Sequence, residues 1–133
     1  MTGKWIKFIG ASLFILIMMV SCKPSDKYAG EWYGVRGDGV KVMINFSKDK
    51  ELSFVDEDGN EDVYEMNQTA TGIQNSTRYF RVEIDEKDYY VVFEDTDDED
   101  NAQLIRQTNH ADDFEDVVGD IIYIMNRNDY PSP

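Results

Sequence analysis

The sequence predicts an all-β domain: a small antiparallel meander barrel of about eight strands with one short C-terminal helix. Apolar residues recur with a period of two in short segments, most clearly over residues 40–46. Turn-forming residues separate these segments, and the chain shows neither a βαβ alternation nor an internal repeat. A sheet of this size must hide its edges, and closing into a barrel does so.

Seven strands are expected before residue 110, namely 31–36, 40–46, 52–55, 62–69, 78–84, 89–94 and 102–107. The Asp58-Gly59 pair predicts a tight turn with a positive φ between the third and fourth of them. Residues 71–77 are polar around Gly72 and Asn75, which predicts a connection rather than a strand. Residues 85–88 are expected to form a four-residue turn.

Residues 111–126 fit two structures. Apolar residues at helical spacing favour one amphipathic helix over the whole segment. Gly119 and the strand-forming residues 121–124 oppose that interpretation. We predict a helical turn over 111–118 that Gly119 stops, followed by a last strand over 120–127. Residues 128–133, which contain two prolines, are expected to be a flexible tail.

The first 22 residues form a motif of their own. Lys4 and Lys7 precede the 13 apolar or small residues 8–20, and the segment ends in Met19-Val20-Ser21-Cys22. A run of this length is typical of a signal sequence and falls short of the roughly 20 residues that span a bilayer. The segment resembles a bacterial lipoprotein signal, in which a peptidase cuts before a cysteine that carries a lipid. Only Met19 departs from the usual pattern, which has leucine there.

This resemblance implies a signal peptide, helical in the membrane, over 1–21, and a lipidated Cys22 on the exported side of the cell membrane or outer membrane. A tether over 22–28, a barrel domain over 29–127 and the tail over 128–133 would follow. Lipidation also explains the single cysteine, because an unpaired thiol is a liability in an exported protein. Two alternatives are open: Cys22 follows an ordinary secretory signal without being modified, or residues 5–21 are an uncleaved anchor helix.

The composition limits the partners. Without residues 1–21, which hold two lysines and no acid, 112 residues remain, with 11 basic and 27 acidic side chains and a formal charge of −16. This length suits one domain. Such a surface repels nucleic acid and anionic lipid headgroups, so its natural partners are basic proteins, basic peptides or Ca²⁺. Alternatively, the charge only keeps the domain soluble and away from its neighbours.

The residues Ala29-Gly30-Glu31-Trp32-Tyr33-Gly34 open the first expected strand. A Gly-x-Trp at the start of such a meander resembles the lipocalin-like or calycin group of small β-barrels. The resemblance implies that Gly30 permits a tight entry of the chain, that Trp32 plugs one end of the barrel, and that a ligand binds in the barrel mouth. Alternatively, Trp32 is a core aromatic of another β-sandwich. A barrel this narrow could also fill its interior with side chains and hold nothing.

No catalytic set of residues is apparent in the sequence. His110 is the only histidine, and its polar, acidic surroundings predict an exposed loop. Without a second histidine or a free thiol, Cys–His catalysis and His-rich zinc sites are excluded. Paired carboxylates could serve a glycosidase, but among 27 acidic residues some pair is always present, so this signal is unspecific. We expect no enzymatic activity and no cofactor.

Two acidic segments are candidates for calcium-binding loops. Counted from Asp56, Gly59 is fourth and Asn67 is twelfth, so residues 56–67 fail the EF-hand pattern of Gly at six and Glu at twelve. Residues 94–101 are a denser group of oxygen ligands and are otherwise explained as a solvated loop. The candidate ligands for weak Ca²⁺ binding there are Asp95, Asp97, Asp98 and Asp100.

The sequence therefore leads to a lipid-anchored, non-enzymatic binding protein of the cell envelope. A small apolar ligand in the barrel mouth or a partner on the acidic face are the two binding modes that we expect. The alternative function is an acidic inhibitor or decoy of a cationic protein such as a lysozyme. A third possibility is an envelope enzyme that acts through two carboxylates in a cleft.

Overall fold

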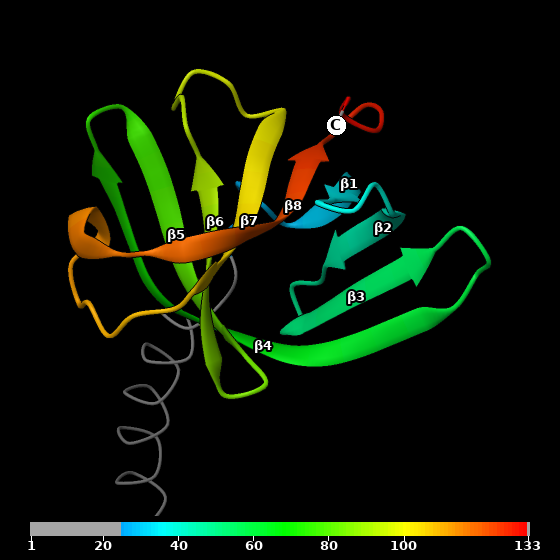
Figure 1. Cartoon of the computed structure of the whole chain (residues 1–133), viewed down its shortest axis with the longest axis horizontal. Coiled ribbons are helices and arrows are strands. Elements are labelled where there is room, and N and C mark those ends of the chain that lie inside the picture. Colours follow the sequence, from blue (N-terminus) through cyan, green and yellow to red (C-terminus); the bar gives the residue numbers. More distant parts are fainter. Residues whose placement is uncertain (1–24, 133) are drawn as a thin grey trace, which may run out of the picture.

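Eight strands, each paired with its neighbour along the chain, form a closed antiparallel barrel (Figure 1). The structure is a computed structural model that describes residues 25–132, so the expected signal and Cys22 lie outside the described residues. The strands are β1 (Gly30–Arg36), β2 (Lys41–Phe46), β3 (Glu51–Asp56), β4 (Glu61–Gln74), β5 (Thr77–Ile84), β6 (Lys87–Phe93), β7 (Asn101–Gln107) and β8 (Gly119–Asn126). The predicted all-β meander is confirmed.

The barrel closes where the first strand meets the last. On one side β1 pairs with β2, and on the other it pairs with β8 in a register that runs from Tyr33 opposite Asn126 to Arg36 opposite Tyr123. Each strand therefore has a neighbour on both sides over at least part of its length. This arrangement satisfies backbone hydrogen bonds that an open sheet would leave at its two edges.

The inward face of the barrel is apolar. Within residues 25–132 no polar or charged side chain is buried, and the side chains that fill the interior come from alternate positions of the strands. An eight-stranded barrel is just wide enough for side chains to fill it. The largest fully buried members of this core are Trp32, Tyr28, Phe46, Ile44, Leu52, Met66, Leu104, Met125, Val82 and Val91.

Two hairpins have two-residue turns with positive φ at both positions. They are Asn75-Ser76 (φ 50° and 69°) and Asp85-Glu86 (φ 52° and 63°). This is the turn whose twist matches that of the flanking strands. The four-residue turn expected over 85–88 is thus too long, because Lys87 already pairs with Ile84. The expected turn at Asp58-Gly59 is confirmed, with φ 87° at Gly59.

The connection expected over 71–77 is wrong, because β4 continues to Gln74 and pairs with β5. The reason lies in Gly72, which suggested a turn. A Cβ at Gly72 would lie 2.5 Å from the Tyr79 hydroxyl oxygen, so the glycine makes room for the tyrosine ring that crosses it from the paired strand. Thr71 adds a hydrogen bond from its hydroxyl to the Tyr79 carbonyl oxygen at 3.1 Å.

The helical turn expected over 111–118 is reduced to one 3₁₀ turn, Phe114–Asp116, and the last strand begins at Gly119. Phe114 holds this turn against the outside of the barrel, where its ring stacks on Tyr79 with 4.2 Å between ring centres. Gly119 does not act as a helix stop. A Cβ there would lie 2.5 Å from the Arg106 carbonyl oxygen, so the glycine permits close pairing of β8 with β7.

Candidate functional site

One end of the barrel is closed by Trp32 and Tyr28. Trp32 is fully buried, and its Nε1 donates a hydrogen bond to the Tyr28 carbonyl oxygen at 2.8 Å. The Tyr28 ring packs against Phe46 and Phe80, with about 5 Å between ring centres. Its hydroxyl donates to Gln68 Oε1 at 2.8 Å. Trp32 and Tyr28 therefore fill this end of the barrel, and the short segment before β1 packs beside Trp32.

Arg127, which no sequence pattern marks as functional, covers Trp32 from outside. Its guanidinium carbon lies 3.9 Å from the centre of the indole ring. Its Nη1 donates to the Glu31 carbonyl oxygen at 3.0 Å, and its Nη2 donates to the Lys27 carbonyl oxygen at 3.1 Å. Burial lowers the pKa of this guanidinium. A cation held directly after the last strand thus ties the end of β8 to the entry of β1.

Gly30 contributes to the same closed end. Its φ of +97° lies in the region that glycine adopts without strain, and a Cβ there would lie 3.4 Å from Arg127 Nη1. Gly30 thus enters the barrel in a conformation that other residues rarely adopt, beside the arginine that covers Trp32.

The opposite end of the barrel holds a cavity of about 300 Å³, which we call the mouth cavity. Its floor is apolar, formed by Leu104, Ile84 and Ile122. Four aromatic side chains stand around it, and three of them touch. Phe54 stacks on Tyr123 with 5.3 Å between ring centres and meets Tyr64 edge-on at 5.9 Å; the fourth is Tyr89.

Charged side chains form the rim of the mouth cavity. Two are basic, Arg36 and Lys87, and two are acidic, Asp62 and Asp85. Arg36 is held by Asp38, whose carboxylate accepts two hydrogen bonds from the guanidinium at 2.9 and 2.7 Å. This pairing lowers the pKa of Asp38 to about 2. The mouth cavity thus combines an aromatic interior with polar groups of both signs at its opening.

A second hollow of about 440 Å³ adjoins the mouth cavity, and we call it the acidic groove. Tyr64 and Asp85 line both spaces, so the two are neighbours at the β5–β6 turn. The other residues that line the groove are Val63, Glu65, Asn67, Glu83 and Glu86. The sequence did not predict this groove, because it depends on how far β4 extends past the end of β5.

The calcium candidates lie in the loop between β6 and β7, and two of them accept hydrogen bonds from other residues of that loop. Asp95 Oδ1 accepts a hydrogen bond from the Asp97 N–H at 2.9 Å. Asp98 accepts from the Asp100 N–H at 3.1 Å and from Asn101 Nδ2 at 2.8 Å. These bonds give the carboxylates a role in shaping the loop. Calcium binding there stays a prediction.

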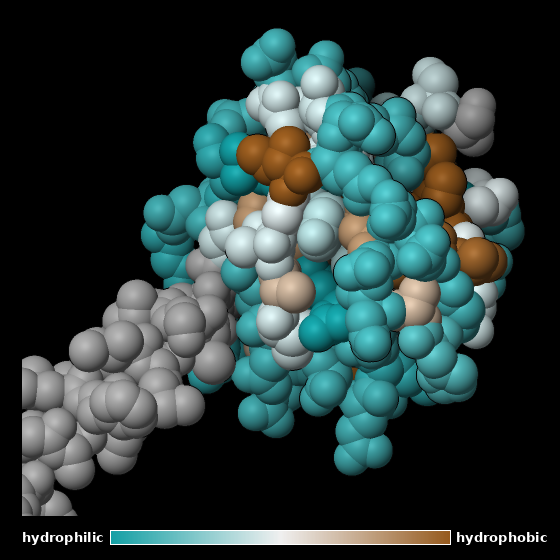
Figure 2. Space-filling view, turned by 90° about the vertical axis from the view of Figure 1, so that its left-hand side faces the viewer, coloured by the Kyte–Doolittle hydropathy of each residue, from teal (hydrophilic) through white to brown (hydrophobic). Residues whose placement is uncertain are grey.

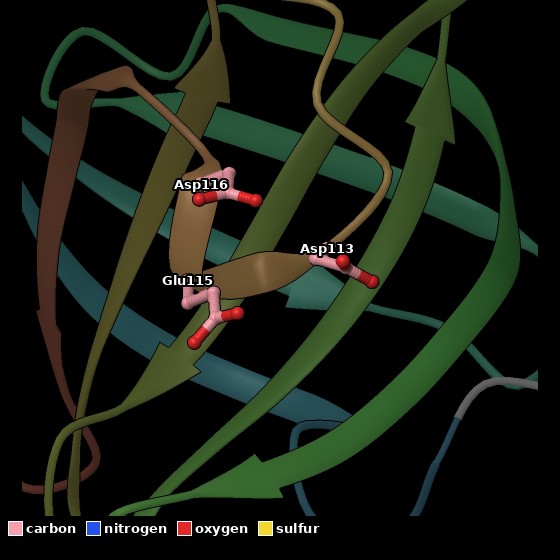
Figure 3. A group of neighbouring side chains, drawn as sticks. All are labelled: Asp113, Glu115 and Asp116. Carbon is pink, nitrogen blue, oxygen red and sulfur yellow. The ribbon is translucent and has the colours of Figure 1, made fainter.

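A different group of carboxylates does converge. Asp113 directly precedes the 3₁₀ turn, and Glu115 and Asp116 lie in it (Figure 3). Within residues 25–132 they are the one group of three acidic, histidine or cysteine side chains whose ligand atoms lie within 4.8 Å of one another. All three are exposed. Glu115 Oε2 also accepts a hydrogen bond from Gln74 Nε2 at 3.0 Å. His110 lies nearby along the chain and is exposed, in a loop as expected.

Comparison of the chain with protein-family models, with curated proteins and with solved structures found no match. Among residues 25–132, no helix has the length and apolar character that crossing a membrane requires. The mouth cavity and the acidic groove must therefore be interpreted from their own chemistry.

Proposed function

We propose that this protein is a lipid-anchored, non-enzymatic binding protein of the cell envelope, with a lipocalin-like barrel that holds a small ligand in its mouth cavity. The lipid at Cys22 would hold the barrel on the exported side of the membrane. The lipoprotein-like pattern of residues 1–22 supports the anchor. The Gly30 and Trp32 motif at a closed barrel end supports the lipocalin-like interpretation.

The observation that carries the ligand proposal is the contrast between the two ends of the barrel. Trp32, Tyr28 and Arg127 cover one end, whereas the other end keeps about 300 Å³ of space among aromatic side chains. This volume lies at the lower limit of ligand pockets, which measure roughly 300–1,000 Å³. The ligand is therefore small and flat, with an apolar body for the rings and polar groups for Arg36, Asp62 or Lys87 at the rim.

A neutral fluorescent aromatic probe, N-phenyl-1-naphthylamine, tests the mouth cavity. We expect its emission to rise on binding to the full chain in neutral detergent kept below its critical micelle concentration, because micelles would themselves take up the probe. Ile122→Trp fills the mouth cavity and should weaken binding by about tenfold or more, because the cavity has little room to spare. Ile124→Trp is the matched control, since Ile124 lies on the outside of the same strand, 40% exposed. Equal binding by both variants would contradict the proposal.

The anchor has its own test. We expect the mature protein to begin at Cys22 and to carry a lipid, so its mass should exceed that of residues 22–133 by the mass of the acyl groups. Cys22→Ser should abolish lipid incorporation, whereas Ser25→Ala should leave it unchanged. An unmodified cysteine in the mature protein, or an intact N-terminus, would contradict this part of the proposal.

The charge supports a second candidate function, the binding of a cationic protein. The chain carries 27 acidic and 13 basic residues, and Figure 2 shows a largely hydrophilic face on which hydrophobic residues form only small, separate patches. Charge of this size raises the association rate of a basic partner and makes it fall with salt. A lysozyme is a suitable basic probe. No complex at low ionic strength would exclude this candidate.

A further inference from the structure

Strand β4 extends past its neighbour β5. It begins at Glu61, but its pairing with β5 begins only at Met66, which lies opposite Ile84. Figure 1 shows β4 as a long strand that runs beside β3 over its first part and beside β5 over its second. Within the described residues, the stretch 61–65 is therefore paired with β3 on one side and has no strand on the other.

The direction of the backbone groups shows which of them are free. The Met66 N–H donates to the Lys50 carbonyl oxygen at 2.8 Å, so the backbone groups of Met66 point towards the β3 side. The direction of the backbone N–H and C=O groups alternates from one residue to the next along a strand. The backbone groups of Tyr64 therefore also point towards β3. The backbone groups of Val63 and Glu65 point the other way, where their N–H and C=O groups meet no strand formed by residues 25–132. Such a row of groups is a template for one more strand.

The residues around this edge indicate which side chains an added strand would need. The acidic groove runs along it and brings together Glu65, Glu83, Asp85 and Glu86. Apolar surface lies between these acids, because Val63 is 51% exposed and Tyr64 is 39% exposed. An added strand would alternate its side chains between the outer face, where Glu65 and Glu83 stand, and the inner face, where Tyr64 borders the mouth cavity.

We propose that an extended basic segment of a partner protein pairs with β4 at residues 61–65. Its main chain bonds to the N–H and C=O groups of Val63 and Glu65. Its basic side chains lie in the acidic groove, and the alternate side chains, which are apolar, lie against Tyr64. This mode of recognition takes its affinity from main-chain hydrogen bonds and its selectivity from the side-chain pockets. The inference rests on the second candidate function, the binding of a cationic protein, and does not require that the mouth cavity holds a ligand.

A second copy of this chain fits the edge less well. Pairing of two β4 edges would bring the acidic groove of one copy against that of the other, and like charges placed opposite each other destabilise a sheet. The positive side chains of a basic partner would instead neutralise the charges of Glu65 and Glu83 when it binds. The charge around the edge therefore favours a foreign segment.

A labelled peptide of eight residues that alternates lysine and valine tests the proposal, with fluorescence anisotropy as the readout and the full chain in neutral detergent. We expect binding that weakens from low to physiological salt. N-methylation of every second amide of the peptide removes its donors and should weaken binding by about tenfold or more. A peptide that alternates glutamate and valine should not bind.

Two variants of the protein locate the binding. Val63→Pro removes an N–H that β3 does not use, and should weaken peptide binding about as much as N-methylation of the peptide does. Val63→Thr keeps the donor and should bind like the unmodified chain. Glu65→Gln with Glu83→Gln should reduce the salt dependence. Asp112→Asn with Asp113→Asn removes the same charge away from the groove and should leave binding within about twofold.

The outcomes separate the two ideas. If the N-methylated peptide binds the unmodified chain as tightly as its parent, the edge is not used and the inference is wrong, while the acidic candidate function stands. If neither the basic peptide nor a basic protein binds at low salt, both fail. If the chain forms a dimer that Val63→Pro dissociates, the edge is occupied by a second copy and the inference is wrong. The peptide comparison remains decisive even if Val63→Pro fails to fold.

Discussion

The guanidinium of Arg127 lies 3.9 Å from the centre of the Trp32 ring at the closed end of the barrel. The two residues are far apart in sequence, at the start of β1 and just after β8, and their contact covers the line along which these strands close the barrel. Because two hydrogen bonds to the Lys27 and Glu31 carbonyl oxygens also hold the arginine, its contribution combines charge, ring contact and backbone satisfaction.

We expect Arg127→Ala to lower the free energy of unfolding by about 2–4 kcal/mol, because it removes a partly desolvated cation–π contact and two charge-assisted hydrogen bonds. Arg127→Lys keeps the charge but cannot reproduce both hydrogen bonds, so its free energy of unfolding should lie between those of the unmodified protein and Arg127→Ala. Arg106→Ala is the control, since its ion pair with Asp120 is exposed and is worth under about 1 kcal/mol. Urea unfolding measures all three, and equal losses for Arg127→Ala and Arg106→Ala would contradict the role of Arg127.

We expect Gly30→Ala to destabilise the fold by about 1–2 kcal/mol, because φ is +97° and the new methyl group would touch Arg127. Gly39→Ala separates these causes, as Gly39 has φ +89° but open space around it. Gly37→Ala has neither feature and should change stability by under about 0.5 kcal/mol. The melting temperature should be lowest for Gly30→Ala, higher for Gly39→Ala and highest for Gly37→Ala. An unchanged melting temperature in Gly30→Ala would refute the argument.

The strand order was predictable because alternation of apolar and polar residues is a local signal. Val42, Ile44 and Phe46 all point into the core, as their period of two indicates. The extent of β4 was not predictable in this way. Gly72 carries a local turn signal, but the Tyr79 ring that lies across it comes from a paired strand, and one sequence does not reveal that register.

The candidate site was only partly predictable for a related reason. Trp32 is the aromatic residue of the tripeptide Gly30-Glu31-Trp32 that opens β1, whereas Arg127 is a single basic residue after the last strand and belongs to no periodic pattern. Its one sequence signal is its position directly after a strand that must close against the first. The acidic groove depends on the offset between Glu61 and the β5–β6 turn, which only the folded register reveals.

We expect Phe114→Ala to release the 3₁₀ turn from the outside of the barrel. The ring stacks on Tyr79 at 4.2 Å and lies 5.5 Å from Tyr90, so its loss should lower stability by about 1–3 kcal/mol. Hydrogen exchange of the Val118 N–H, which donates to Asn109 Oδ1, should become faster. Val118→Ala is the control, because that side chain is 61% exposed. Unchanged exchange in Phe114→Ala would show that the loop is held by other contacts.

Tyr28 should make stability fall at alkaline pH. Burial raises the pKa of its hydroxyl to about 12, against about 10 in the unfolded chain. The folded state therefore favours the protonated ring, which donates to Gln68. This contribution is complete below pH 10 and is lost as pH rises towards 12, because the unfolded chain releases the proton first. Unfolding free energies at pH 9, 10 and 11 measure the fall, and tyrosinate absorbance follows the titration. Tyr28→Phe has no proton to release, so its stability should change less over this range; an identical decline in both proteins would assign the effect to other groups.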